Sequence, residues 1–305
     1  MTPVDLFLQI FQDVILPVFI AIAVGVLLDR AFHVDKKTLA TLSIYVLQPC
    51  LVFASLSQLT APARDVGAMI LYMALITIAL CLIAIAAAKL LRWNDRAVDA
   101  LVLSVAFLNA GNMGLSIILF AFGEQGLELG TVLFVTSNLT CHTLAPFFAA
   151  RSQGGSLKAV MRVFKLPGPY AFAIALGLRA LGVAVPELVL KPIALLGQAA
   201  VPTMLLLLGI QLSQTRLTRR YREVSIGVFL RLAVGSLLAF GMAALMGLRG
   251  MARSVAIVEA STPTAVNSTL MAVEFEADAE YVTSVVFLTT LLSSLTLTLV
   301  IALVR

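Results

Sequence analysis

The sequence predicts an all-α integral membrane protein with ten transmembrane helices, arranged as two inverted five-helix repeats with crossed, broken helices 4 and 9. Three observations support this prediction. Of the 305 residues, 61% are hydrophobic and 12% are charged, whereas soluble proteins carry about 25% charged and about 45–50% apolar residues. Apolar runs long enough to cross a bilayer recur along the whole chain. Short sequence matches relate the first half of the chain to the second.

The composition excludes several classes of protein. A soluble enzyme needs more polar surface than this chain offers, and a disordered chain carries far fewer apolar residues. The net charge of +5 does not indicate a nucleic-acid partner, because the basic residues lie between apolar runs. The two histidines and three cysteines have no metal-ligand or CxxC spacing, so no cofactor, metal cluster or disulfide framework is expected from them.

The ten spans are assigned in chain order by length, because a helix needs about 20 apolar residues to cross the hydrocarbon layer. The runs lack the alternating pattern of a membrane β-barrel. The N-terminus has no basic region and no small-residue cleavage site, so the first span is expected to insert as a mature helix. The predicted spans are 13–31, 38–59, 66–89, 98–122, 127–150, 166–184, 186–213, 222–247, 250–273 and 279–304.

The distribution of basic residues predicts the orientation of the spans. Fourteen lysines and arginines flank one side of the spans and five flank the other, and the richer side is assigned to the cytoplasm. Both termini are then expected outside the cytoplasm of a multi-pass protein in a cell membrane, the inner membrane in a bacterium. The fourteen residues are Arg30, Lys36, Lys37, Lys89, Arg92, Arg96, Arg151, Lys158, Arg162, Lys165, Arg216, Arg219, Arg220 and Arg222.

Matches at a nearly constant offset divide the chain into two halves. The predicted units are a first five-helix repeat at 1–150, a cytoplasmic linker at 151–165 and a second repeat at 166–305. Because five is odd, the second repeat enters from the opposite face, and inverted repeats are typical of secondary transporters. The matching pairs are Ala21–Gly25 with Ala173–Gly177, Pro49 with Pro202, and Ser104–Ala106 with Ser254–Ala256.

The fourth and ninth spans contain helix-breaking residues at matching positions. Gly111 and Gly114 weaken the fourth helix, and Pro263 interrupts the ninth because proline lacks a backbone N–H. Two broken helices that cross would place helix N-termini, with their positive dipole ends, near the midplane, where they suit a carboxylate. The alternative is that the two glycines allow close packing between helices.

Glu259 is the acidic residue that lies deep inside a span, beside the predicted break at Pro263. An ionisable residue at this depth is a functional candidate by default. It either binds Na⁺ together with Asn112 and nearby hydroxyls or carries a proton. The alternative is a structural role, as a partner of Arg231 or of freed backbone N–H groups.

Polar residues at the breaks complete the candidate site. Asn109, Asn112 and Asn267 offer donors to a carboxylate and acceptors to a cation, or they cap the broken helix ends. Thr262 is a weaker candidate, because a hydroxyl commonly bonds to its own helix. Arg231, inside the eighth span, either reaches the interface, pairs structurally or balances an anion or Glu259.

The fifth span carries a polar cluster in an otherwise apolar run. Ser137 and Thr140 share one helix face, which we expect to complete an ion site beside the fourth span. Asn138 and His142 share another face, where interhelical hydrogen bonding is the alternative and is favoured for His142. Gln48 with Pro49 is expected to bend the second span toward the substrate.

These residues resemble those of the auxin efflux carrier family, which includes the plant PIN auxin exporters and bacterial malate and malonate permeases. The resemblance covers nearly the whole chain, and the order and spacing of its short motifs make it specific. The residues that carry it are Leu16-Pro17 with Gly25, Gly111-Asn112-Met113-Gly114, Phe122-Gly123, Leu196-Gly197-Gln198 with Pro202, Leu207-Leu208-Gly209, Glu259 to Asn267, and Thr289 to Leu295.

The resemblance implies a fold shared with NhaA-type antiporters and bile-acid symporters. Spans 1, 2, 6 and 7 would form a scaffold that also makes a homodimer, and spans 3–5 and 8–10 would form a transport domain with an elevator motion. The implied substrates are small organic anions, either dicarboxylates or auxin-like acids. The sequence departs from the plant members, which have a proline at the first crossover, so Gly111 and Gly114 are expected to make that break here.

The expected function is therefore secondary transport of small organic anions across a lipid bilayer, without enzymatic activity. One alternative is a sodium-coupled bile-acid-type symporter, which shares the crossed-helix architecture. Another is a membrane-embedded enzyme that uses Glu259 or the pair Cys141 and His142. Adjacent residues on a helix point about 100° apart, so that pair is a poor combination of nucleophile and base.

Overall fold

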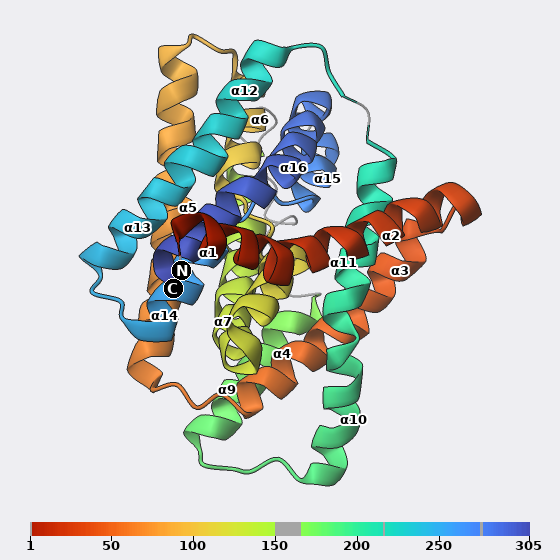
Figure 1. Ribbon diagram of the computed structural model, residues 1–305, viewed down its shortest axis with the longest axis vertical. Helices are drawn as coiled ribbons and strands as arrows, with labels where there is room; N and C mark the ends of the chain where they lie inside the picture. Colours follow the sequence, from red (N-terminus) through yellow and green to blue (C-terminus); the bar gives the residue numbers. More distant parts are fainter. Residues whose placement is uncertain (1, 150–165, 216, 275–276) are drawn as a thin grey trace.

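The computed structural model describes residues 2–149, 166–215, 217–274 and 277–305. Within these ranges all regular elements are helical, and one isolated antiparallel bridge joins Leu108 to Thr264. The predicted linker at 151–165 lies outside the described residues. Figure 1 shows a bundle in which helices from the two ends of the chain lie among each other. The prediction of an all-α membrane protein is confirmed at this level.

Seven helices in the described part of the chain are long and apolar enough to cross a membrane. The predicted spans 166–184 and 250–273 are not among them, because α9 and α14 have only 14 and 11 residues. The predicted span 98–122 is divided between the 12-residue α6 and the start of Ala110–Cys141. Apolar length in the sequence did not distinguish a continuous helix from one that is interrupted. The seven are Pro3–Phe32, Lys36–Ser57, Ala63–Leu90, Ala110–Cys141, Glu187–Ser213, Tyr221–Leu245 and Ala279–Val304.

The first two helices each contain a π-helical turn just before a proline. In Pro3–Phe32 the turn η1 precedes Pro17, and in Lys36–Ser57 the turn η2 precedes Pro49. The wider turn makes room for the proline ring, which would otherwise clash with the preceding turn. The elements are α1 (Pro3–Ile10), η1 (Phe11–Ile15), α2 (Leu16–Phe32), α3 (Lys36–Leu42), η2 (Ser43–Leu47), α4 (Gln48–Ser57) and α5 (Ala63–Leu90).

The rest of the described chain has helices of very different lengths, from the five residues of η5 to the 34 of α7. A left-handed backbone at Gly123 (φ 66°) divides α7 into two segments that run in different directions. The elements are α6 (Asp95–Ala106), η3 (Ala110–Leu115), α7 (Ser116–Ala149), α9 (Pro167–Ala180), α10 (Glu187–Gln198), α11 (Ala200–Ser213), α12 (Tyr221–Phe229), η5 (Leu230–Val234), α13 (Gly235–Leu245), α14 (Gly250–Ala260), α15 (Asn267–Glu274) and α16 (Ala279–Val304).

Helices α2 and α11 are packed backbone against backbone. A Cβ at Gly209 would lie 2.1 Å from the carbonyl oxygen of Ile22, and one at Gly25 would lie 2.3 Å from that of Leu206. Only glycine permits this approach, which explains why both helices carry one at the crossing point. Figure 1 shows α2 and α11 side by side, with α4 and α10 nearby.

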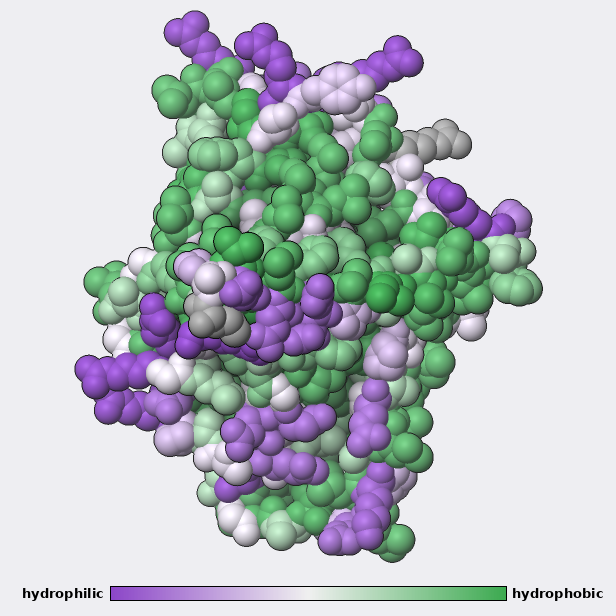
Figure 2. All heavy atoms as spheres, in the orientation of Figure 1, coloured by the Kyte–Doolittle hydropathy of each residue, from purple (hydrophilic) through white to green (hydrophobic). Residues whose placement is uncertain are grey.

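The outer surface is strongly apolar. Leucines at 90, 181, 188 and 245 are between 78% and 86% exposed. Figure 2 shows broad hydrophobic areas on one face, with hydrophilic side chains projecting at its top and gathered in its lower half. In water such a surface would drive aggregation, whereas a bilayer accepts it.

Candidate functional site

Two helix interruptions lie against each other in the interior. Helix α6 ends at Ala106 and η3 begins at Ala110, while α14 ends at Ala260 and α15 begins at Asn267. The Asn109 N–H donates to the Pro263 carbonyl at 2.8 Å, and the Ala265 N–H donates to the Phe107 carbonyl at 2.9 Å. The two unwound segments thus satisfy each other's backbone groups, which would cost several kcal/mol each if left unpaired in an apolar interior.

The first interruption is not where the sequence predicted it. It occupies residues 107–109, and Gly111 and Gly114 lie in the helical turn that follows. A Cβ at Gly111 would lie 2.7 Å from the Phe134 ring, and one at Gly114 would lie 2.4 Å from the Glu259 carboxylate. The prediction that these glycines make the break is therefore wrong, and close packing, the alternative considered, explains them.

Arg231 holds the ends of both interrupted helices. Its side chain is fully buried, and it donates to the carbonyls of Thr262 and Val105 at 2.9 Å each and to that of Ala260. These carbonyls lie at or just beyond the C-termini of α6 and α14, where the helix dipole is negative. Of the alternatives for Arg231, the structure shows structural pairing, and the side chain does not reach the interface.

Glu259 and Asn112, which the sequence predicted to share a cation, lie on opposite sides of η3. The Glu259 side chain has no exposed surface, and neither carboxylate oxygen has a hydrogen-bond partner among the described residues. It contacts Gly114, whereas Asn112, two positions away and so on the opposite helix face, lines a pocket. The structure does not bring Glu259 and Asn112 together at one point.

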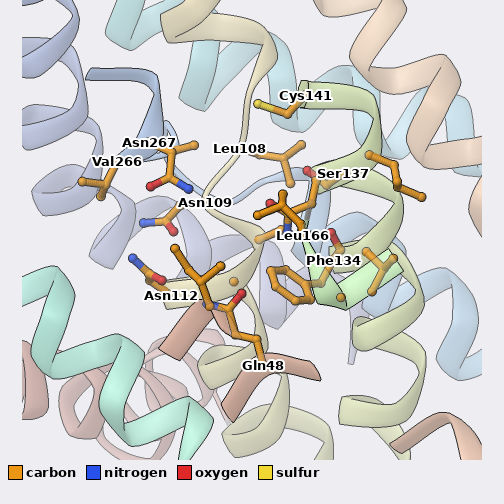
Figure 3. Close-up of a pocket in the computed structure, with 18 of the residues that line it drawn as sticks. Gln48, Leu108, Asn109, Asn112, Phe134, Ser137, Cys141, Leu166, Val266 and Asn267 are labelled. Atoms are coloured by element: carbon orange, nitrogen blue, oxygen red, sulfur yellow. Dashed lines mark hydrogen bonds between the residues drawn. The ribbon is translucent and has the colours of Figure 1, made fainter. Parts of the chain in front are cut away.

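A cavity of about 180 Å³ lies beside the two interruptions. Its walls include α4, the second segment of α7, the start of α9, and α11, and Figure 3 shows its lining. Five of the predicted site residues line it, and none of the lining side chains that the structure describes is charged. The five predicted residues are Asn109, Gly111, Asn112, Ser137 and Asn267.

The other predicted site residues lie outside this cavity. The Thr262 hydroxyl donates to the Glu259 backbone carbonyl at 2.7 Å, and the Thr140 hydroxyl donates to that of Thr136 at 2.7 Å. Both hydroxyls thus bond to their own helix. Pro263 contributes its carbonyl to the crossing. His142 lies in α7, but its side chain is outside the described residues.

Sequence reasoning missed part of the pocket wall. Phe134 and Gln211 line it and were not predicted, and Gln48, predicted only as part of a bend, also lines it. The Oε1 atom of Gln211 and the Nδ2 atom of Asn109 are buried without a hydrogen-bond partner among the described residues. A polar residue in the apolar run 201–213 was the signal that could have indicated Gln211.

The electrostatics of the cavity favour a negatively charged ligand. Both η3, which continues into α7, and α15 begin at the cavity wall. The first N–H groups of a helix have no partner within the helix, and its N-terminus carries about half a positive charge. Arg231 neutralises the opposite, negative ends of α6 and α14. At the start of α15 the Ser268 and Thr269 N–H groups already donate to the carbonyls of Ala265 and Val266 at 3.1 Å. The asparagine amides and the first N–H groups of η3 are therefore the donors suited to a small carboxylate.

Comparisons with known proteins identify relatives among membrane transporters. Residues 10–301 match the model of the family described as "Membrane transport protein". An uncharacterized transporter of Methanocaldococcus jannaschii is 25% identical over 301 residues, covering 94% of this chain and 97% of the relative. A second, from Methanothermobacter thermautotrophicus, is 28% identical over 87% of this chain and 88% of its own. A Rhizobium meliloti protein named "Putative malonate transporter" is 28% identical over 66% of this chain and 65% of its own.

Proposed function

Because the chain belongs to the membrane transport protein family, the one that the auxin efflux carrier motifs indicated, we propose that it is a secondary transporter of small organic anions. The observation that carries this proposal is the pocket at the crossed interruptions. Two helix N-termini and three asparagines converge there on a cavity of about 180 Å³. This is the chemistry that a carboxylate requires.

We propose an architecture of ten spans in two inverted repeats, with α6–η3–α7 and α14–α15 as equivalent broken helices. The matching sequence offsets and the two interruptions that pair at one point support it. In this proposal α2, α4, α9, α10 and α11 belong to a scaffold that forms a homodimer. The crossed helices belong to a transport domain that moves as an elevator against that scaffold.

The proposed substrate class is a carboxylic acid anion of about the size of a dicarboxylate. The relative named as a malonate transporter supports this class. Neutral amide donors and helix N-termini bind an anion without the strong attraction of a lysine or arginine. Such a site can release its ligand on the other side of the membrane.

We propose that the coupling ion is a proton carried by Glu259. A buried carboxylate without a partner is costly in its ionised form, and protonation removes that cost. Sodium coupling, as in a bile-acid-type symporter, is the alternative that the experiment below separates.

We place the protein in a cell membrane with both termini outside the cytoplasm, and we assign the pocket to an inward-facing state. Basic flanks support the orientation. Ala40 lies near Lys36, and Gly168 lies just after the basic linker. Both line the pocket, which suggests that its mouth is on the cytoplasmic side.

Uptake into liposomes reconstituted with the purified protein tests the proposal. Labelled malonate, malate, lactate, propionate and indole acids would be supplied while Na⁺ and pH gradients are varied independently. We expect uptake of at least one acid above that of empty liposomes, with a rate that follows the pH gradient. Flux of none of these acids would contradict anion transport, and a rate that follows only the Na⁺ gradient would contradict proton coupling.

Glu259→Gln provides the matched variant for the coupling step. This substitution keeps the size of the side chain and replaces the carboxyl group with an amide that cannot bind or release a proton. The dependence of uptake on the pH gradient should therefore disappear, while exchange of the acid across the membrane persists. Unchanged pH dependence in this variant would show that Glu259 does not carry the proton.

A further inference from the structure

We propose that Gln211 and Gln48 recognise a second polar group on the transported acid, so that the protein selects acids with two polar ends over simple monocarboxylates. This inference rests on the proposed function. It assigns a role in specificity to two side chains from helices that do not contribute to the crossing.

Polar side chains line the pocket from the crossed interruptions and from three other helices, α4, α7 and α11. Asn109, Asn112 and Asn267 come from the crossed interruptions, whereas Gln48 comes from α4 and Gln211 from α11. In Figure 3 the three asparagines lie on one side of the pocket, Phe134 and Ser137 lie on the other, and Gln48 lies below. Gln48 and Gln211 line the same pocket, so a ligand whose carboxylate is held at the interruptions can place a second polar group against them.

Gln211 is poised for a partner that the protein does not supply. Its Oε1 atom is buried and has no hydrogen-bond partner among the described residues. A primary amide presents a carbonyl acceptor and an NH₂ donor, and rotation about its last bond exchanges them. A hydroxyl, a protonated carboxyl or a second carboxylate on the ligand can each satisfy one of these groups.

Gln48 is held in place by its own helix. Its Nε2 atom donates to the Ser43 hydroxyl at 3.2 Å across the π-helical turn η2. This bond orients the amide at the pocket wall, next to Ile44 and Val52, which also line the pocket. The π-helical turn before Pro49 therefore positions a polar group at an otherwise apolar wall.

The apolar lining explains why these two amides would discriminate. Val52, Leu207 and Phe134 would accept the hydrocarbon end of a monocarboxylate. Such a ligand would exclude water and leave the Gln211 amide unpaired. A site built to hydrogen-bond a ligand group strongly rejects the analogue that lacks this group, because the buried partner then stays unsatisfied.

Competing uptake of matched acids tests the inference in the reconstituted full-length protein. Malonate and propionate have the same carbon number and differ by one carboxyl group, and lactate adds a hydroxyl to propionate. We expect the wild-type protein to carry malonate or lactate at least ~10-fold faster than propionate. Gln211→Leu and Gln48→Leu should each lower that ratio by about 10-fold, through slower uptake of the bifunctional acid.

Propionate uptake reports whether each variant is folded. Gln9→Leu is the control, because Gln9 is exposed on α1 and lies outside the pocket, and its ratio should equal that of the wild type. If Gln211→Leu fails to fold, as gel filtration would show, Gln211→Met takes its place.

Two results would overturn the inference while anion transport stands. One is a wild-type protein that carries propionate as fast as both bifunctional acids. The other is an unchanged ratio in folded Gln48 and Gln211 variants. A wild-type protein that carries no acid at all would instead contradict the proposed function, so the two failures are distinguishable.

Discussion

Arg231 and Glu259 are both fully buried beside the same pair of helix interruptions, and their surroundings are opposite. The guanidinium donates to three backbone carbonyls, whereas the carboxylate has no hydrogen-bond partner among the described residues. A satisfied buried charge acts as a fixed structural element, whereas an unsatisfied carboxyl can change its protonation. This contrast fits a structural role for Arg231 and supports the proposed ion-coupling role of Glu259.

Arg231→Met tests the structural role. We expect the free energy of unfolding to fall by roughly 3 kcal/mol or more, because each buried carbonyl left without a donor costs about 1–3 kcal/mol. The free energy of unfolding of Arg231→Lys should lie between those of the wild type and Arg231→Met. A lysine ammonium keeps the charge but lacks the planar guanidinium that reaches three carbonyls. Denaturant unfolding in detergent would measure this, with Arg222→Met on the exposed surface of α12 as the control. Equal stability of Arg231→Met and the control would refute the assignment.

Gly114→Ala tests the contact between η3 and Glu259. The new Cβ would lie 2.4 Å from a carboxylate oxygen, and overpacking of this kind costs about 1–3 kcal/mol. Glu259→Ala removes the clashing group, so Gly114→Ala should cost much less in that background. A double-mutant cycle on unfolding free energies measures the coupling between the two positions.

Gly67→Ala on α5 is the matched control for that cycle, because nothing lies within 4 Å of its added Cβ. It should be neutral or stabilise by up to about 1 kcal/mol through helix propensity. Additive effects of Gly114→Ala and Glu259→Ala would show that the two residues do not touch in the folded protein.

At this scale the sequence identified candidate residues at the two interruptions, but it did not predict what their side chains contact. Glu259 stands out because an acid inside an apolar run is rare, and Asn109, Asn112 and Asn267 stand out beside helix breakers. The partners of Arg231 could not be predicted, because the carbonyls of Val105 and Thr262 carry no side-chain signal and lie far away in the sequence.

At the scale of elements, two pairs of helices come into close backbone contact at positions where at least one helix has a glycine and therefore no side chain. The backbones of α2 and α11 touch at Gly25 and Gly209, and Gly197 lets α10 approach the backbone of α4 at Leu51. Gly177 in α9 is the residue that matches Gly25 in the internal repeat, and an added Cβ there would meet nothing within 4 Å. Gly25 and Gly177, which occupy equivalent positions in the two repeats, thus have different environments, and the sequence alone did not reveal this difference.

Gly209→Ala should separate α2 from α11. The added Cβ would lie 2.1 Å from the Ile22 carbonyl oxygen, and because backbone cannot move as a side chain does, we expect a loss of about 3 kcal/mol. Thermal unfolding in detergent would detect it as a lower melting temperature. Gly177→Ala is the control and should not lower it. A Gly209→Ala protein as stable as Gly177→Ala would mean that the two helices are not in backbone contact.

At the scale of the whole molecule, composition and apolar length were sufficient to predict an all-α membrane protein, and family motifs agreed with the family that residues 10–301 match. Predicted breaks at 109–114 and 259–269 lie near the two interruptions found, at 107–109 and 261–266. The part of the pocket wall made by α4 and α11 could not be predicted, because it forms only when these helices pack beside the crossing.

The proposed function requires that the three asparagines at the crossing bind the carboxylate of the transported acid. The most direct measurement is the concentration dependence of malonate uptake in liposomes for Asn109→Leu, Asn112→Leu and Asn267→Leu. Because a hydrogen bond to a charged group contributes about 1.5–3 kcal/mol, we predict a KM raised at least ~10-fold in each variant. If the KM and the maximal rate of all three variants equal those of the wild type, the asparagines do not bind the carboxylate.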